Sequence, residues 1–250
     1  MTVIKQKAKP QAGAPGRFEA GLPGGSQTRP QAGLPGGSGP GTPGGPGAGA
    51  QANFKSRLAA PPTSYKLREP NIPGYADILA IASILLGYPD AALCEQRTAI
   101  YAVVAALPAS PAQKALRKFT DWWAGGSPSA SPQALRENYV ATFDQQRNNA
   151  LYVTYFAHAD ARSRGSALYG LKQLYRAAGF VPAGDELPDY LPTVCQFAAL
   201  APLDEALTAL AAAREAVYAV QQNLASQGSP YADLFTAVQI IIEKGVRPCG

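Results

Sequence analysis

Glycine and proline are concentrated at one end of this chain, and their distribution divides the sequence before any fold is considered. Residues 1 to about 50 are mostly Gly, Pro, Ala, Ser and Gln, and the segment AGLPGGS occurs at 20–26 and again at 32–38. Ordering a backbone costs roughly 1–2 kcal/mol per residue, and this segment has few apolar side chains whose burial would offset that cost. We expect residues 1–64 to be a disordered tail and residues 65–250 to be the folded domain.

From about Tyr65 onward, apolar residues recur at intervals of three and four, and Pro and Gly stand where helices begin or end. No segment shows the alternation of polar and apolar residues that is typical of a strand. We therefore predict an all-α fold, a single helical bundle of about seven to nine helices. The predicted helices run from Tyr75 to Leu86, Ala91 to Leu107, Pro111 to Trp123, Pro132 to Phe143, Leu151 to His158, Ser163 to Ala178, Leu187 to Leu200, Pro202 to Leu224 and Pro230 to Lys244.

The net charge of +5 does not indicate a nucleic-acid-binding domain, because most of it lies in the tail. Five basic residues before residue 30, opposed only by Glu19, contribute +4 of the +5. The folded part is therefore close to neutral, and the tail is better interpreted as a solubilising or spacing segment.

The sequence favours a soluble protein of the cytoplasm. Its longest apolar run, from Ile78 to Leu86, is far shorter than the roughly 20 residues that cross a bilayer. The N-terminus lacks the apolar run of a signal peptide. Three cysteines at wide intervals fit a reducing compartment and do not have the spacing of a zinc or redox site.

Polar residues gather between Tyr139 and Leu200, but their spacing does not support catalysis. His158 is the only histidine and lies near Asp160, yet no Gly-x-Ser-x-Gly motif is present and the predicted fold has no sheet to hold one. One His and three scattered Cys do not form a zinc site. We expect no catalytic residue, no metal ligand and no cofactor. The acidic residues Asp185, Glu186 and Asp189 stay open to two interpretations, a general acid/base cluster or charges that favour the helix after them.

Arg164 suggests how this region is held together. Its guanidinium can pair with Asp160 or Asp189 and so hold its own helix against the Leu-Pro-Asp-Tyr-Leu-Pro turn at 187–192. Such an arrangement leaves a polar-rimmed groove between helices, a type of surface that accepts an amphipathic peptide helix. The residues themselves thus indicate a helical domain that binds a partner.

Five segments of this region follow one another in a recognisable order and spacing: YVATFD at 139–144, LYVTYF at 151–156, ADARSRGSAL at 159–168, YRAAGF at 175–180 and ELPDYLP at 186–192. They closely resemble the NarJ family, the delta subunit of respiratory nitrate reductase, within the wider group of helical molybdoenzyme chaperones. The resemblance extends from about Tyr75 to about Leu210 and includes the Leu-Gly-Tyr-Pro-Asp sequence at 86–90.

This resemblance implies an assembly chaperone, not an enzyme, that binds the catalytic subunit of respiratory nitrate reductase and keeps it competent for insertion of the molybdenum cofactor. The chaperone is expected to be absent from the mature enzyme and to hold no cofactor itself. In the family the recognised element is the N-terminal segment of the catalytic subunit, bound as a helix in a groove. The positions of this chain that match the motifs are the candidate partner-binding residues: Tyr139, Phe143, Asp144, Tyr152, Asp160, Arg164, Gly165, Glu186, Asp189 and Tyr190.

Two positions depart from the family pattern. Ala159 stands where a glycine is usual, and Gln196 stands where a carboxylate is usual. We therefore place the acidic rim of the groove on Asp160, Glu186 and Asp189. Three alternatives stay open: a chaperone of another molybdoenzyme, a helical enzyme that uses the acidic cluster with His158, and a tail that is a separate interaction module.

Overall fold

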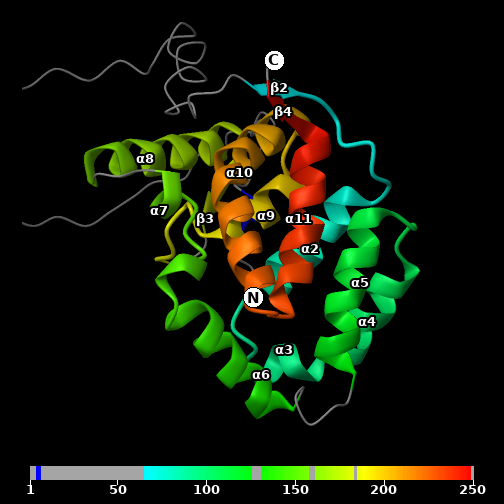
Figure 1. Cartoon of the computed structure of the whole chain (residues 1–250). Helices are drawn as coiled ribbons and strands as arrows, with labels where there is room; N and C mark the ends of the chain where they lie inside the picture. The colour runs from blue at the N-terminus through cyan, green and yellow to red at the C-terminus, as the bar shows by residue number, and fades with distance from the viewer. Residues whose placement is uncertain (1–3, 7–64, 126–130, 158–160, 183–184, 249–250) are drawn as a thin grey trace, which may run out of the picture.

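The computed structural model describes residues 4–6, 65–125, 131–157, 161–182 and 185–248, and in this part of the chain the fold is a helical bundle (Figure 1). Eight of its α-helices have eight or more residues, which confirms the all-α prediction. The helices are α2 Tyr75–Leu85, α3 Ala91–Glu95, α4 Arg97–Ala106, α5 Pro111–Ala124, α6 Pro132–Tyr139, α7 Thr154–Ala157, α8 Ala161–Ala177, α9 Leu191–Leu200, α10 Leu203–Ser226 and α11 Tyr231–Gly245. Among the described helices, none is both long and apolar enough to cross a membrane.

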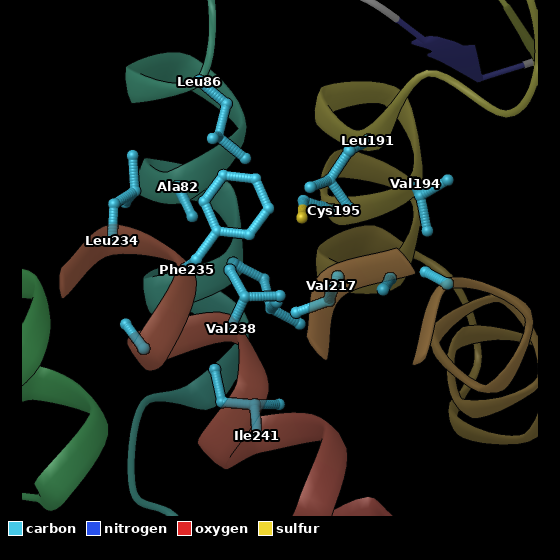
Figure 2. Close-up of a cluster of buried hydrophobic side chains, with 14 of the residues drawn as sticks. Ala82, Leu86, Leu191, Val194, Cys195, Val217, Leu234, Phe235, Val238 and Ile241 are labelled. Carbon is cyan, nitrogen blue, oxygen red and sulfur yellow. The ribbon is translucent and has the colours of Figure 1, made fainter. Parts of the chain in front are cut away.

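The core lies where α2, α9, α10 and α11 meet. Helix α11 packs against α5 on one side and α10 on the other, and α9 packs against α2 and α10. Figure 2 shows Phe235 of α11 between Ala82 of α2 and Cys195 of α9, and all three side chains are fully or almost fully buried. In the same view Leu86 and Leu191 lie at the same end, so the end of α2 lies beside the start of α9.

Local capping signals explain where several helices begin. The Ser110 hydroxyl accepts a hydrogen bond from the Gln113 N–H at 3.1 Å, and the Ser131 hydroxyl accepts one from the Ala134 N–H at 3.2 Å. In both cases proline follows in the first turn, where its missing N–H costs no helical hydrogen bond. These two helix starts are as the sequence predicts.

Three predicted helix boundaries are wrong. The helix expected from Ala91 to Leu107 is broken at Gln96, which ends α3 and precedes α4. The helix expected from Leu151 is present only as α7. The helix expected from Leu187 begins four residues later, at Leu191. The last two errors have one cause, because residues 151–153 pair with residues 189–191 as an extended segment: the Leu191 N–H donates to Leu151 O at 2.7 Å and the Val153 N–H to Asp189 O at 2.9 Å.

A one-turn π-helix, Val140–Asp144, follows α6, and a 3₁₀ turn, Arg147–Asn149, comes next. Four three-residue strands, which the sequence did not predict, complete the described structure. β1 (Ile4–Gln6) pairs antiparallel with β3 (Phe180–Pro182), and β2 (Tyr65–Leu67) pairs antiparallel with β4 (Val246–Pro248). β1 lies inside the segment expected to be disordered; residues 1–3 and 7–64 of that segment lie outside the described residues.

Candidate partner-binding groove

A groove of about 660 Å³ lies between the C-terminal half of α2, helix α3 and helix α9. Its walls come from two parts of the chain about a hundred residues apart, which the packing of α2 on α9 brings together. The lining residues are Ala80, Ser83, Ile84, Gly87, Tyr88, Asp90, Ala92, Leu93, Gln96, Glu186, Tyr190, Pro192, Gln196 and Leu200.

Apolar side chains of the groove are open to solvent. Ile84 is 41% exposed, Tyr88 48% and Leu200 57%, although each belongs to or adjoins a helix that packs on the core. Exposed apolar surface that is gathered in one concave site is typical of a binding surface. The groove therefore suits an occupant that brings apolar side chains of its own.

The charged groups of the groove are both acidic. Among the lining residues that the structure describes, Asp90 and Glu186 are the only ionisable ones apart from tyrosine, and none is Lys, Arg or His. Asp90 precedes α3, where its carboxylate accepts a hydrogen bond from the Leu93 N–H at 2.8 Å, and Glu186 precedes α9. Figure 2 shows the end of α2, at Leu86, beside the start of α9, at Leu191. Asp90 follows this end of α2 in the sequence and Glu186 precedes this start of α9, so we assign the acidic residues to one end of the groove and the apolar Ala80 and Leu200, farther along the two helices, to the other.

Glu186 and Tyr190 are held in place by the extended segment that precedes α7. Tyr152 forms a β-bridge with Tyr190, the two ring centroids are 5.5 Å apart, and the Tyr152 hydroxyl donates to a Glu186 oxygen at 3.0 Å. Burial, together with this hydrogen bond, raises the pKa of Tyr152 to about 12, so the hydroxyl stays a donor at neutral pH. Tyr152 is thus a support for the groove wall.

Asp189, expected on the acidic rim, is instead completely buried beneath it. One of its oxygens accepts hydrogen bonds from the Thr154 N–H, at 3.2 Å, and from the Thr154 hydroxyl. Arg164 donates from Nε to that same hydroxyl at 3.1 Å, and its Nη2 lies 3.9 Å from Asp189 Oδ2. The predicted pairing of Arg164 with Asp189 is therefore present, as a contact that holds α8 to the turn before α9. The placement of Asp189 on the rim is wrong, because a buried carboxylate that accepts these bonds cannot face a ligand.

Tyr139 and Phe143 lie behind the groove in an aromatic cluster. The Tyr139 hydroxyl donates to Leu86 O at 3.2 Å, and its ring meets the groove residue Tyr88 edge to face at a centroid distance of 5.5 Å. Phe143 packs against Tyr139, and both are almost fully buried. Burial raises the pKa of Tyr139 above its ordinary value. Tyr139, which packs on Phe143, thus supports Tyr88 from beneath the groove.

Asp144 and Gly165 do not line the groove. Both are exposed, Asp144 on the π-helix and Gly165 on α8. Asp160 and His158 lie outside the described residues. Of the ten predicted partner-binding residues, Glu186 and Tyr190 line the groove, and Tyr139 and Tyr152 contact its lining residues.

The sequence interpretation missed the wall made by α2 and α3. Ile84 and Tyr88 were seen only as part of a helix and its end. A signal was present: the helix is apolar beyond the one face that faces the core, and Ile84 lies off that face. Within the described residues, no group of three or more His, Cys, Asp or Glu side chains is placed to hold a metal ion.

The sequence of residues 106–237 matches the family model described as nitrate reductase delta subunit. The chain belongs to the nitrate reductase delta subunit family. This confirms the resemblance found in the motifs. Helices α2 and α3, which form one wall of the groove, precede the matched region of this family.

Curated members of the family are similar to this chain over part of its length. A probable nitrate reductase molybdenum cofactor assembly chaperone of Bacillus subtilis is 40% identical over 122 residues, which are 48% of this chain and 66% of that protein. The nitrate reductase molybdenum cofactor assembly chaperone of Escherichia coli is 30% identical over 163 residues, 63% of this chain and 66% of that protein. A nitrate reductase-like protein of Mycobacterium tuberculosis is 34% identical over 109 residues, only 17% of its own length. The chain thus spans just under two thirds of the two chaperones.

Proposed function

We propose that this protein is an assembly chaperone that binds the catalytic subunit of nitrate reductase and keeps it competent for insertion of the molybdenum cofactor. The observation that carries the proposal is the apolar, acid-ended groove in a chain whose relatives are nitrate reductase molybdenum cofactor assembly chaperones. The work is done by binding and release in the cytoplasm, and no covalent step is needed.

The environments of the three acidic residues at 185, 186 and 189 support partner binding over catalysis. Asp189 already holds Thr154 and is buried, Glu186 accepts the Tyr152 hydroxyl, and Asp185 is exposed. A general acid or base has to reach the proton that it transfers. Of the three carboxylates, only Glu186 faces the groove, which favours a role in partner recognition.

The occupant that we propose is the N-terminal segment of the catalytic subunit, bound as an amphipathic helix. Its apolar side chains would lie against Ile84 and Leu200, and a basic side chain would lie at the end formed by Asp90 and Glu186. Apolar anchors supply most of the affinity of a helix in a groove, while the charges set its direction. The polarity of the groove therefore supports one orientation of the bound helix.

Isothermal titration of the full chain with a synthetic peptide of that N-terminal segment tests the proposal. We expect saturable binding that Ile84→Glu weakens at least tenfold, which corresponds to about 1.4 kcal/mol, because a carboxylate would be desolvated against the apolar anchors. Glu186→Gln should weaken binding less, and the loss should shrink at high salt, since salt screens a charge pair that solvent can reach.

Val103→Glu is the matched control, because Val103 is 53% exposed on α4 and does not line the groove. It should leave the affinity unchanged. If a well-folded protein does not bind this peptide but binds the corresponding peptide of another molybdoenzyme, the proposal that nitrate reductase is the client is wrong. If Val103→Glu weakens binding as much as Ile84→Glu, the groove is not the site.

A further inference from the structure

Helix α8 runs along the outside of the bundle (Figure 1). Its exposed face carries basic residues, and none of them lines the groove. One side of the helix is buried, through residues such as Leu171, Leu174 and Tyr175. The opposite side follows the three- and four-residue spacing of a single helical stripe and is exposed. The exposed stripe, which we call the α8 stripe, consists of Arg162, Gly165, Ser166, Tyr169, Lys172 and Arg176.

The charge of the α8 stripe is one-sided. Helix α8 carries four basic residues and no acidic residue in 17 positions. The rest of the folded part does not share this bias, since the chain from residue 65 onward has fifteen Lys and Arg against sixteen Asp and Glu. Lys172 and Arg176 form no hydrogen bond or ion pair within the described part of the chain. The positive charges of Lys172 and Arg176 are therefore local and available to a partner.

We propose that the α8 stripe is a second docking surface that binds an acidic helix of the client protein. This proposal rests on the client named above. From Arg162 to Arg176 the stripe is about 21 Å long, given ~1.5 Å per helical residue. Carboxylates spaced along one face of a partner helix would meet its cations in turn. Tyr169, 63% exposed at the centre, supplies an amphipathic contact, and a Cβ added at Gly165 would meet no atom within 4 Å, so a partner backbone can approach closely there.

The observations favour an acidic protein over the two other polyanionic partners. A helix that lies in a membrane surface needs a free apolar face, and the apolar side of α8 is buried in the bundle. Nucleic-acid binding depends on neutralising many phosphates, whereas the folded part of this chain has no excess of basic residues. A short basic stripe on a neutral domain is complementary to a short acidic stripe.

The α8 stripe and the groove are parts of one hydrogen-bonded frame. Arg164, on the inner side of α8, donates to Thr154, and Thr154 donates to Asp189 in the turn that carries Glu186 and Tyr190 into the groove. Two surfaces fixed relative to each other bind one client with an effective concentration that raises the overall affinity beyond that of either contact.

The test uses the full chain and a nitrate reductase catalytic subunit that lacks its N-terminal segment, so that the groove does not contribute. We expect the truncated subunit to bind, and the double variant Lys172→Glu/Arg176→Glu to weaken that binding at least tenfold. Binding to the unmodified chain should also weaken as salt increases. The matched control is Lys114→Glu/Arg117→Glu on α5, which makes the same charge change at two exposed residues of another helix.

The control pair should stay within about twofold of the unmodified chain, and the N-terminal peptide should bind both variants normally, which also reports that they are folded. The proposal is overturned if the truncated subunit does not bind, or if the α8 variant and the control behave alike. It is also overturned if the α8 variant loses binding to phosphatidylglycerol vesicles and not to the subunit. Failure of the peptide titration, with the truncated subunit still bound through α8, would count against the groove alone.

Discussion

Individual side chains in this protein show how motif residues divide between recognition and support. Glu186 and Asp189 stand three positions apart in one motif, yet Glu186 lines the groove and Asp189 is buried under it. The sequence predicts the motif but not this division, because a carboxylate in a turn looks the same whether it faces solvent or a buried threonine. The partner of Asp189 is Thr154, 35 residues earlier, and only the tertiary fold brings the two together.

Removing the Asp189 carboxylate should destabilise the fold. Asp189→Ala leaves the buried Thr154 N–H without an acceptor and Arg164 without its ion pair, so we expect the free energy of unfolding to fall by about 2–4 kcal/mol. Asp189→Asn, which keeps the shape and one acceptor oxygen, should cost less. Urea denaturation followed by circular dichroism measures both changes.

Asp185→Ala is the control, since Asp185 is exposed, and its effect should stay within about 0.5 kcal/mol. One other outcome would assign Asp189 to client recognition and not to stability. If Asp189→Ala keeps full stability but no longer binds the client peptide, the carboxylate acts in recognition after all.

Helices and their boundaries were predictable where local chemistry decides them. The cap residues Ser110 and Ser131, each with proline behind it, begin α5 and α6 as expected. Boundaries set by distant partners were not predictable: residues 151–153 have helical periodicity but lie extended, because they pair with residues 189–191. The groove could not be predicted from the sequence for the same reason, since its α2 and α9 walls meet only in the folded chain.

Two glycines, Gly74 before α2 and Gly165 within α8, should respond in opposite ways to the same substitution. Gly74 precedes α2 with φ +72°, and an added Cβ would lie 3.3 Å from Pro108 Cδ, so Gly74→Ala should cost about 1–2 kcal/mol. Gly165 lies inside α8 with open space around it, so Gly165→Ala should stabilise the protein by up to ~1 kcal/mol. Each variant is the control for the other, and thermal unfolding measures both. Equal changes in the two midpoints would show that backbone conformation at Gly74 does not limit the start of α2.

The aromatic cluster links parts of the molecule that are far apart in sequence, because its members come from different helices. Tyr231 of α11 lies at the centre, with ring centroids of Phe119 at 5.1 Å, Trp122 at 6.0 Å and Phe143 at 4.8 Å. Tyr139 extends the cluster to Tyr88 at the groove. Phe119, Tyr139, Phe143 and Tyr231 are buried. The helical periodicity of the sequence does not predict that they meet, because each contact depends on how two helices cross.

Burial of tyrosine side chains, in this cluster and elsewhere, makes the stability of the fold sensitive to alkaline pH. Burial raises the pKa values of Tyr139, Tyr175 and Tyr231 above their ordinary value, and it raises that of Tyr218 to about 12. A group whose pKa is higher in the folded state keeps its proton more tightly there. Its contribution to stability is therefore complete below the unfolded pKa of about 10 and is lost as pH rises above it.

We expect the free energy of unfolding to fall steadily above about pH 10, with the buried phenols ionising only as the helices unfold. Tyrosinate absorbance and circular dichroism, followed together during an alkaline titration, should then share a transition. Tyr231→Phe removes one phenol from the apolar cluster and keeps the ring, so it should make stability fall less steeply with pH while changing it little at neutral pH. If tyrosinate absorbance is complete before the helices unfold, or if Tyr231→Phe steepens the alkaline loss, the cluster does not exclude solvent as its burial indicates.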